Sequence, residues 1–439
     1  MRRVIEVEEL TRVEGHGRIE VVIEGSEVKD VKMAIFEGPR FFEAFIESVH
    51  YEKVPDIMRR ICAICTASHS LASIRTIENA FDVKVTEQTR ILRDLLIHGE
   101  MIESHALHVF MLALPDFLGF PDAIRMASKY PKEVKAALQL KHAGNMVHNI
   151  VSGREVHGMN ERVGGFSKIP SEKELKDIRT AMVSTKQTAE LAVELFAKVE
   201  TPKYAESENT LMALDPGEKF GFMGDYVLVS DGTRHPVQNY LNLTNERTVK
   251  HSHAKFSSYK GSSYMVGALP RVLLNKDKLE GTAAELYDEH KDILTSKNTL
   301  MNNLAQAIEL VHSVDRCIED VDILLSNGLK NEGLVEIEPK ASRGVGAVEA
   351  PRGILYHDYT FDENGCIVKA NVITPTAQNA ANMEKDYRVA AERLIEEPDE
   401  KLMNAFEIIA RAYDPCISCS VHLLSLIHIS EPTRLGMIS

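Results

Sequence analysis

The sequence predicts an α+β fold in a single large domain, with a core of long helices, an N-terminal antiparallel β region and smaller peripheral sheets. Two patterns in the 439-residue chain lead to this prediction. Apolar and polar residues alternate over residues 4–36, as they do in strands that bury one face. From about residue 40, apolar residues recur at helical spacing over most of the chain. Since no repeat or low-complexity linker divides the sequence, we expect one interwoven, predominantly helical domain.

The elements follow this order along the chain. Turns near residues 15–17 and 25–26 separate the predicted N-terminal strands. Thr86 is a suitable N-cap for a long helix that reaches the Leu114-Pro115 pair. Further helices are expected at residues 70–82, 131–150, 172–200, 283–326, 380–397 and 399–413. The regions without helical periodicity are residues 202–275, which read as irregular with short strands, and residues 354–374, which read as strands.

The charge balance excludes several classes of partner. The chain has 65 acidic and 51 basic residues, a net charge of −14, which disfavours nucleic-acid binding and docking on an anionic membrane surface. No run approaches the ~18 apolar residues of a membrane-spanning helix. The N-terminus also lacks the apolar stretch of a secretory signal. We therefore expect a cytoplasmic protein with neither nucleic acid nor membrane as a partner.

Two CxxC motifs are the strongest chemical signal in the sequence. They are Cys62-Ala-Ile-Cys65 and Cys416-Ile-Ser-Cys419, near opposite ends of the chain. Four thiolates favour soft metals such as zinc, iron–sulfur clusters or nickel. A zinc ribbon closes a loop of only ~15–20 residues, whereas here the whole fold must bring the two pairs together. A zinc- or cluster-binding scaffold and a redox metal centre both remain open at this point.

The residues around the cysteines resemble a known family. The segments Arg60-Ile-Cys-Ala-Ile-Cys-Thr-Ala-Ser-His69 and Asp414-Pro-Cys-Ile-Ser-Cys-Ser-Val-His422 are similar to the first and last signature motifs of the nickel–iron hydrogenase large, catalytic subunit. The likeness is strongest to the α subunit of cytosolic NAD(P)-linked hydrogenases, also called sulfhydrogenases. It extends over about residues 4–422 through the segments at 11–18, 37–45, 97–108, 259–268, 349–357 and 374–379.

This resemblance implies a nickel–iron centre, with carbon monoxide and cyanide on the iron, that oxidises dihydrogen reversibly. Cys62 and Cys416 are the implied terminal nickel ligands, and Cys65 and Cys419 the implied bridges between nickel and iron. Heterolytic cleavage of dihydrogen needs a soft metal for the hydride and a base for the proton, and we expect the Cys416 thiolate to be that base. Arg352 is implied over the metals, near cyanide. Because a guanidinium has a pKa of ~12.5 or more, Arg352 suits electrostatic support better than proton transfer.

Other site residues are carried over from the same resemblance. Glu14 is the implied first proton relay, since a carboxylate within hydrogen-bonding reach of a thiol can accept its proton. His69 is implied as a hydrogen-bond donor to Cys65, where it would tune the electron density of the sulfur. Pro375 and Thr376 match the residues that contact the second cyanide.

A second metal site is implied close to the first. Glu43 and His422 match its side-chain ligands, and the Val372 carbonyl matches its backbone ligand. Oxygen ligands with several waters suit magnesium, although the histidine also allows iron(II). The sequence departs from the usual family pattern at Ala63, where glycine is common, and at Gln378, where tryptophan is often found. We expect these two departures to alter tuning rather than abolish activity.

The remaining residues imply partner subunits. Beyond the two motifs only Cys317 and Cys366 remain, too few for a four-cysteine iron–sulfur cluster. The string Gly344-Val-Gly346 lacks the third glycine of a dinucleotide-binding fingerprint. Iron–sulfur clusters, FAD and NAD(P) are therefore expected on other chains of a heterotetramer. These are a small iron–sulfur subunit, a flavin- and NAD(P)-binding subunit, plus a ferredoxin-like subunit, with nickel-insertion proteins and a maturation protease acting during assembly.

The last residues form a tail of uncertain origin. We expect a catalytic domain at residues 1–422 and a tail at 423–439. In the family a protease cuts after the residue matching His422, yet residues 424–434 resemble the translation of a sequencing adapter. Both origins of the tail stay open. So do three alternative functions: a deazaflavin- or heterodisulfide-complex-linked hydrogenase, a non-catalytic relative, and the zinc or cluster scaffold.

Overall fold

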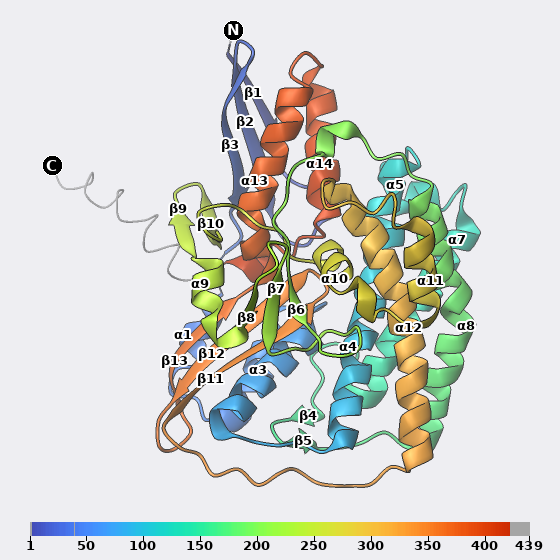
Figure 1. Ribbon diagram of the computed structural model, residues 1–439, viewed down its shortest axis with the longest axis vertical. Helices are drawn as coiled ribbons and strands as arrows, with labels where there is room; N and C mark the ends of the chain where they lie inside the picture. Colours follow the sequence, from blue (N-terminus) through green and yellow to red (C-terminus); the bar gives the residue numbers. More distant parts are fainter. Residues whose placement is uncertain (1, 39, 422–439) are drawn as a thin grey trace, which may run out of the picture.

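A three-stranded antiparallel sheet begins the chain and forms one end of the molecule (Figure 1). The computed structural model describes residues 2–38 and 40–421. The strands run in the order β1 (Arg2–Val7), β2 (Gly17–Glu24) and β3 (Glu27–Ile35). Alternate residues of β2 are buried, as the sequence pattern requires. The predicted N-terminal β region is thus confirmed.

Four long helices form the bundle on the other side of the molecule (Figure 1). Helix α4 contacts both α7 and α12, and α12 packs along α8. Helices α4 and α7 approach most closely at Gly99 and Gly144. A Cβ atom on Gly144 would lie 2.7 Å from the Gly99 carbonyl oxygen, so only glycine permits this crossing. The bounds of the four helices are α4 Glu87–Leu107, α7 Pro131–Val147, α8 Glu172–Ala197 and α12 Asn302–Asn327.

A second three-stranded sheet supports helix α3 (Thr66–Phe81). Its strands are β11 (Ser342–Ala350), β12 (Gly353–Phe361) and β13 (Ile367–Ile373), all antiparallel. Gly344 faces α3 so closely that a Cβ atom there would lie 2.0 Å from the Thr76 carbonyl oxygen. The Gly-Val-Gly string therefore serves strand–helix packing, which explains why it lacks the context of a dinucleotide site.

The remaining helices and strands connect these layers. Helices α13 and α14 lie beside the N-terminal sheet, and β6–β8 lie between that end and the bundle (Figure 1). The shorter helices are α1 Phe42–Phe45, α2 Val54–Met58, α5 Leu114–Phe117, α6 Ala123–Met126, α9 Tyr240–Thr244, α10 Ala268–Leu274 and α11 Gly281–His290, and the last two helices are α13 Pro375–Arg393 and α14 Asp399–Ala412. The other strands are β4 Glu161–Arg162, β5 Gly165–Phe166, β6 Met212–Asp215, β7 Tyr226–Val229, β8 Arg234–Pro236, β9 Arg247–Val249 and β10 Ser252–Phe256.

The structure corrects three predictions made from the sequence, two on helices and one on a strand. The helix expected at 283–326 is two helices, α11 and α12, because residues 291–298 leave the helical path between them. The long helix after Thr86 ends its regular α geometry at Leu107 and continues as a π-helix at His108–Ala113. Strand β11 was not expected, since its buried glycines hide the alternating pattern. The N-cap at Thr86 is confirmed: its side chain accepts a hydrogen bond from the Thr89 amide at 3.1 Å.

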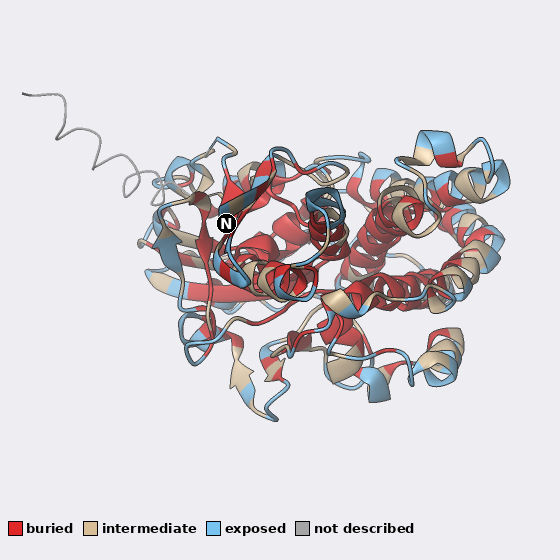
Figure 2. Cartoon of the chain, turned by 90° about the horizontal axis from the view of Figure 1, so that it is seen from above, coloured by how far each residue is buried: buried red, intermediate tan, exposed pale blue. Residues whose placement is uncertain are grey.

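Buried residues line the inner faces of the helices and sheets, and exposed residues cover the outside (Figure 2). Helix α3 lies deep in this interior: all its residues except Arg75 and Asn79 are buried. Among the described residues, none of the helices combines the length and apolar character needed to span a bilayer. The first turn of α3 and the segment after α14 both reach the interior, and these segments carry the two CxxC motifs.

Candidate metal centre

The first CxxC motif lies where a short 3₁₀ turn gives way to helix α3. Cys62 is in an extended conformation after the turn Arg59–Ile61, and Cys65 is the N-cap residue of α3. The Cys65 backbone amide donates a hydrogen bond to Cys62 Sγ at 3.2 Å. This loop turns both thiols to the same side of the chain, at the positively polarised end of a helix that favours thiolates.

The second CxxC motif follows helix α14 and is held by the N-terminal region. The Ile417 amide donates to the Glu14 carbonyl oxygen at 2.9 Å, and Glu14 pairs with Cys416 in an isolated parallel bridge. The Cys416 amide donates to Thr376 Oγ1 at 2.9 Å. Cys419 lies in a 3₁₀ turn at Ser418–Ser420. Two distant segments thus fix this loop.

The fold brings all four thiols together. The ligand atoms of Cys62, Cys65, Cys416 and Cys419 lie within 4.8 Å of one another, and all four residues are buried. Cys62 Sγ is 3.6 Å from Cys416 Sγ, and Cys65 Sγ is 4.0 Å from Cys419 Sγ. The two cysteines expected as terminal ligands are therefore neighbours, and so are the two expected as bridges.

The donor set fits a cationic soft-metal centre. Hydrogen bonds offered by Cys416, Cys419 and Cys65 hold the pKa of the Cys62 thiol well below its usual value. The neighbouring Cys416 thiol in turn raises the pKa of Cys419 well above its usual value. Four buried thiols in such close contact cannot all ionise unless a cation compensates their charge. A bound metal supplies that charge, and thiolate sulfur selects soft metals.

Arg352 lies at the same site, paired with Asp414. Its Nε donates to the Asp414 carbonyl oxygen at 2.7 Å, and its Nη2 donates to the carboxylate at 2.9 Å. Burial alone would lower the pKa of Arg352, but Asp414 and the cysteines, Cys416 foremost, raise it well above its usual value. Its Nη1 is buried without a hydrogen-bond partner among the described residues. This leaves a donor for a ligand of the metal centre.

Glu14 contacts the segment between the second pair of cysteines. Its carboxylate accepts a hydrogen bond from the Ser418 amide at 3.1 Å and another from the Ser418 hydroxyl. The carboxylate thus contacts a residue that lies two positions after Cys416 and one before Cys419. Among the described residues no hydrogen bond joins this carboxylate to a cysteine sulfur, so the expected relay role remains a prediction.

His69, Pro375 and Thr376 are also buried around the site. Burial lowers the pKa of His69 to about 4, so this imidazole is neutral at pH 7. Its Nδ1 lies 3.3 Å from His357 Nε2. Within the described ranges 2–38 and 40–421 no hydrogen bond joins His69 to Cys65 Sγ, so the expected donor role remains a prediction. Thr376 contacts the site directly, through the amide of Cys416.

Two of the three residues expected at the second metal lie together. The Val372 amide donates to Glu43 Oε1 at 2.8 Å. Both residues line a small cavity of about 30 Å³ that Cys419 and Thr374 also border. A cavity of this size holds a water or an ion. The third residue, His422, lies outside the described residues, as does the tail at 423–439.

Two residues of this site were not expected from the sequence. Arg40 donates to the Ile61 carbonyl oxygen at 2.6 Å and to the Ser418 carbonyl oxygen at 3.0 Å. Its guanidinium therefore joins the two halves of the centre. Because Arg40 belongs to the quoted segment at 37–45, its place in that motif was the available signal.

The other is Glu100 of helix α4, which caps helix α3. Its carboxylate accepts hydrogen bonds from the Ala67 amide at 2.6 Å and from the Ser68 amide at 3.2 Å. The N-cap residue Cys65 makes no side-chain cap of its own, so an acid from another helix replaces it. The signals in the sequence were an acidic residue within an apolar helical stripe and its place in the quoted segment at 97–108.

Comparison with known proteins supports the same assignment. The family model for nickel-dependent hydrogenases matches residues 40–168 and 224–422. The chain is 45% identical over 428 residues to the alpha subunit of sulfhydrogenase 2 from Pyrococcus furiosus, covering 96% of this chain and 100% of that protein. It is 42% identical over 424 residues to the alpha subunit of sulfhydrogenase 1 of the same organism, covering 96% and 98%. A vhu-type F420-non-reducing hydrogenase chain from Methanocaldococcus jannaschii is 35% identical, over 88% of this chain and 98% of that protein.

Solved structures agree on the fold. An NAD⁺-reducing [NiFe]-hydrogenase in its H₂-reduced state matches with a TM-score of 0.85 and 26% identity, over 96% of this chain and 99% of the other. The nickel–iron–selenium hydrogenase from D. vulgaris Hildenborough, at 21% identity and a TM-score of 0.78, shares the fold over 96% of this chain and all of its own. The predicted fold class is confirmed. Sequence motifs, four clustered thiols and relatives all agree, and the chain belongs to the family of nickel–iron hydrogenase large subunits.

Proposed function

We propose that this chain is the catalytic subunit of a hydrogenase that oxidises dihydrogen reversibly and transfers the electrons through partner subunits to NAD(P). The observation that carries the proposal is the cluster of four buried thiols within 4.8 Å. Its family membership supports nickel and iron as the metals and leaves a zinc scaffold without support. A non-catalytic role is disfavoured because all four metal-binding thiols are present.

The proposed roles of the residues follow from their contacts. Cys62 and Cys416 would hold nickel, and Cys65 and Cys419 would hold both metals. When bound, the centre supplies the soft, redox-active site that dihydrogen, which has neither charge nor dipole, requires. Cys416 Sγ accepts the proton, and its burial among other thiols excludes competing water. Pro375 and Thr376 would line the cyanide ligand.

Two further residues complete the proposed proton and charge chemistry. Arg352 keeps its charge and stabilises the thiolates that surround it. Its free Nη1 would donate to cyanide. Glu14 takes the proton from the cysteine segment, because its carboxylate already contacts Ser418 between the two cysteines. His69 is proposed to tune Cys65.

We also propose a magnesium ion, with iron(II) as the alternative, in the cavity next to Cys419. Glu43 would supply a carboxylate oxygen, Val372 its carbonyl oxygen and His422 a ring nitrogen. The oxygen donors and the room for water favour magnesium over a soft metal. The cavity and the Glu43–Val372 hydrogen bond support this proposal.

The partners follow from what the chain holds itself. The two sulfhydrogenase relatives named above are alpha subunits, which implies assembly with other chains. We propose a cytoplasmic heterotetramer with a small iron–sulfur subunit, a flavin- and NAD(P)-binding subunit, plus a ferredoxin-like subunit. Outside the four-thiol site, no other group of three or more metal-binding side chains lies close together among the described residues. Electrons must therefore leave through another chain. Residues 1–422 are the proposed catalytic domain, matured by nickel-insertion proteins and a protease.

A second candidate acceptor is a deazaflavin or a heterodisulfide-reducing complex. The F420-non-reducing relative, at 35% identity, is less similar to this chain than the two sulfhydrogenase chains at 45% and 42%. The structural match to an NAD⁺-reducing [NiFe]-hydrogenase supports NAD(P) as the acceptor, and the sulfhydrogenase relatives support sulfur or polysulfide reduction as a further activity of the assembly. Assays of the purified complex with each acceptor under dihydrogen distinguish these functions.

The decisive experiment is infrared spectroscopy with metal analysis of the complex, purified anaerobically from a host that matures such centres. We expect sharp carbon monoxide and cyanide bands with one nickel per chain. Zinc at the four thiols and no such bands, in fully processed protein, would refute the hydrogenase function. If the tail is still attached, a missing spectrum reports failed maturation, so the length of the chain is measured first by mass spectrometry.

A further inference from the structure

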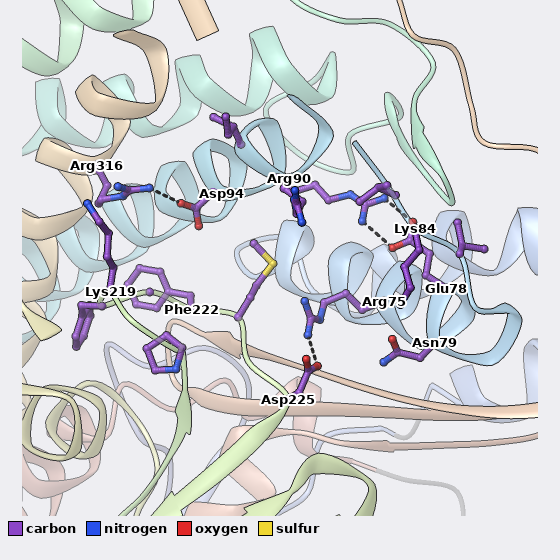
Figure 3. A pocket seen from close by; sticks show the side chains of 18 residues that line it. Arg75, Glu78, Asn79, Lys84, Arg90, Asp94, Lys219, Phe222, Asp225 and Arg316 are labelled. Atoms are coloured by element: carbon purple, nitrogen blue, oxygen red, sulfur yellow. Dashed lines mark hydrogen bonds and ion pairs between the residues drawn. The ribbon is translucent and has the colours of Figure 1, made fainter. Parts of the chain in front are cut away.

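A hollow lined by charged and apolar residues lies away from the metal centre. It has a volume of about 540 Å³ and lies between α3, the start of α4, the segment 216–225 and helix α12. Figure 3 shows its walls, with Arg75 reaching across from α3 to Asp225. None of the residues named above as metal ligands lines it. Its volume is within the ~300–1,000 Å³ typical of small-molecule sites.

The charges of this pocket are unbalanced. All three of its carboxylates are already paired with arginines, as the dashed lines in Figure 3 mark. Asp94 pairs with Arg316 and Asp225 with Arg75, both at 2.9 Å. The third, Glu78, accepts two hydrogen bonds from Arg93, at 2.8 and 2.6 Å. The acids are thus neutralised within the protein. They cannot offset a further positive charge or bind a metal cation without losing these pairs.

Two exposed cations of the pocket form no close ion pair with a described residue, although Lys84, after Lys340, helps to lower the pKa of the nearby Asp82 carboxyl. The side chains of Lys84 and Arg90, both exposed, form no hydrogen bond or ion pair with another described residue, although both line the pocket. Arg75 adds a buried Nε that has no acceptor among the described residues. An unpaired buried donor costs free energy that a bound acceptor would recover. The chain as a whole has a net charge of −14, so this concentration of positive charge is a local feature of the pocket.

The opposite wall is apolar. Phe220 and Phe222 are buried side by side, with ring centroids 5.9 Å apart in an edge-to-face arrangement. Both line the pocket, and Met223 and Ile91 extend this wall. Phe220 and Phe222 are 3% and 0% exposed and back this wall, so the partly buried Met223 and Ile91 provide the apolar surface that a ligand would cover. An inorganic ion would leave that surface in water, whereas an anion with an apolar body would cover it.

We infer that this pocket binds a small organic anion, whose phosphate or carboxylate group is held by Lys84 and Arg90 and whose apolar part packs against Met223 and Ile91. The site lies outside the dihydrogen chemistry and needs no metal. The alternative occupant, an acidic side chain of a partner subunit, makes a different prediction for the assembled complex.

The test uses the assembled complex and phenyl phosphate, benzoate and inorganic phosphate as probes. Hydrogen–deuterium exchange read by mass spectrometry reports binding at segments 84–94 and 216–225, apart from any nucleotide site on a partner. We expect phenyl phosphate or benzoate to slow exchange there, at lower concentration than inorganic phosphate. The comparison of phenyl phosphate with benzoate identifies the anionic group.

The variants Arg90→Gln and Lys84→Gln locate the contacts. Each should raise the half-saturating concentration about tenfold, the effect of one lost charge-assisted hydrogen bond, and higher salt should weaken binding. Arg125→Gln removes an equally exposed arginine outside the pocket and should change nothing. Because neither pocket cation forms a side-chain hydrogen bond or close ion pair among the described residues, melting curves of both variants should stay close to that of the unaltered complex.

Three results would overturn the inference. One is unchanged half-saturation in both pocket variants. A second is the absence of protection by any probe. The third is protection in the isolated processed chain but none in the complex, which would show that a partner subunit covers Lys84 and Arg90.

Discussion

Arg352 and Asp414 form a buried pair in which one guanidinium contacts both the carbonyl and the carboxylate oxygen of the same residue, at 2.7 and 2.9 Å. The pair connects the turn between β11 and β12 with the loop that carries Cys416. Its geometry requires a planar group with several donors, which lysine does not offer. The arginine thus positions this loop and keeps Nη1 without a hydrogen-bond partner among the described residues.

Substitution Arg352→Lys should retain nickel but lose activity. We expect dihydrogen oxidation with an artificial dye to fall ~10²–10³-fold, the usual effect of removing one electrostatic donor, while nickel content stays near one per chain. Arg343→Lys is the matched control, since Arg343 pairs with Asp358 at a half-exposed position. Full activity in the Arg352 variant would contradict the proposed role.

Substitution Glu14→Gln should block proton transfer and leave the centre intact. A relay carboxylate contributes ~10²–10⁴-fold, so turnover should fall at least a hundredfold while the infrared bands keep their positions. Glu9→Gln removes a neighbouring acid that is 63% exposed and paired with His16. If Glu14→Gln turns over as fast as this control, another group receives the proton.

Glu100 should make the chain less stable as the pH rises. Burial raises its pKa to about 8, above the ~4.3 of an unfolded glutamate. Between these values the folded state keeps a proton that the unfolded state has lost, so unfolding becomes easier by up to about 1.4 kcal/mol per pH unit. Glu100→Gln should flatten this decline in the melting temperature of the processed chain between pH 5 and 8. The exposed Glu87→Gln should not, and equal slopes in both variants would show that Glu100 does not titrate in this window.

Substitution Gly144→Ala should destabilise the bundle. The added methyl group would lie 2.7 Å from the Gly99 oxygen and the Glu103 nitrogen, so helices α4 and α7 must separate at a cost of about 1–3 kcal/mol. Gly38→Ala is the control, since a Cβ there has no atom within 4 Å. Denaturant unfolding of both variants measures the difference, and an unchanged midpoint in Gly144→Ala would show that the helices adjust freely.

Local patterns predicted much of the fold, and long-range contacts account for the rest. Thr86 predicts the start of α4 because an N-cap depends only on the next three residues. The break between α11 and α12 escapes detection because apolar spacing continues through it. Strand β11 was not predicted because Gly344 interrupts its alternating pattern. This residue is glycine only because α3 passes so close.

The candidate site shows the same division. Resemblance to the family located Cys62 and Cys416, since each motif is contiguous in the sequence. Glu100 and Arg40 act through partners far away in the chain, and no local pattern reveals which amide or carbonyl they meet. Asp414 lies within a recognised motif, but its pairing with Arg352 appears only in three dimensions.

The division of the four thiols between the two ends of the chain has a consequence for biosynthesis. The ribosome releases Cys62 and Cys65 long before it reaches Cys416 and Cys419. During most of translation the first pair can offer at most two sulfurs to a metal. The complete site therefore forms only after synthesis has passed Cys419, and the order of synthesis itself delays closure until the loop at residues 416–419 has been made.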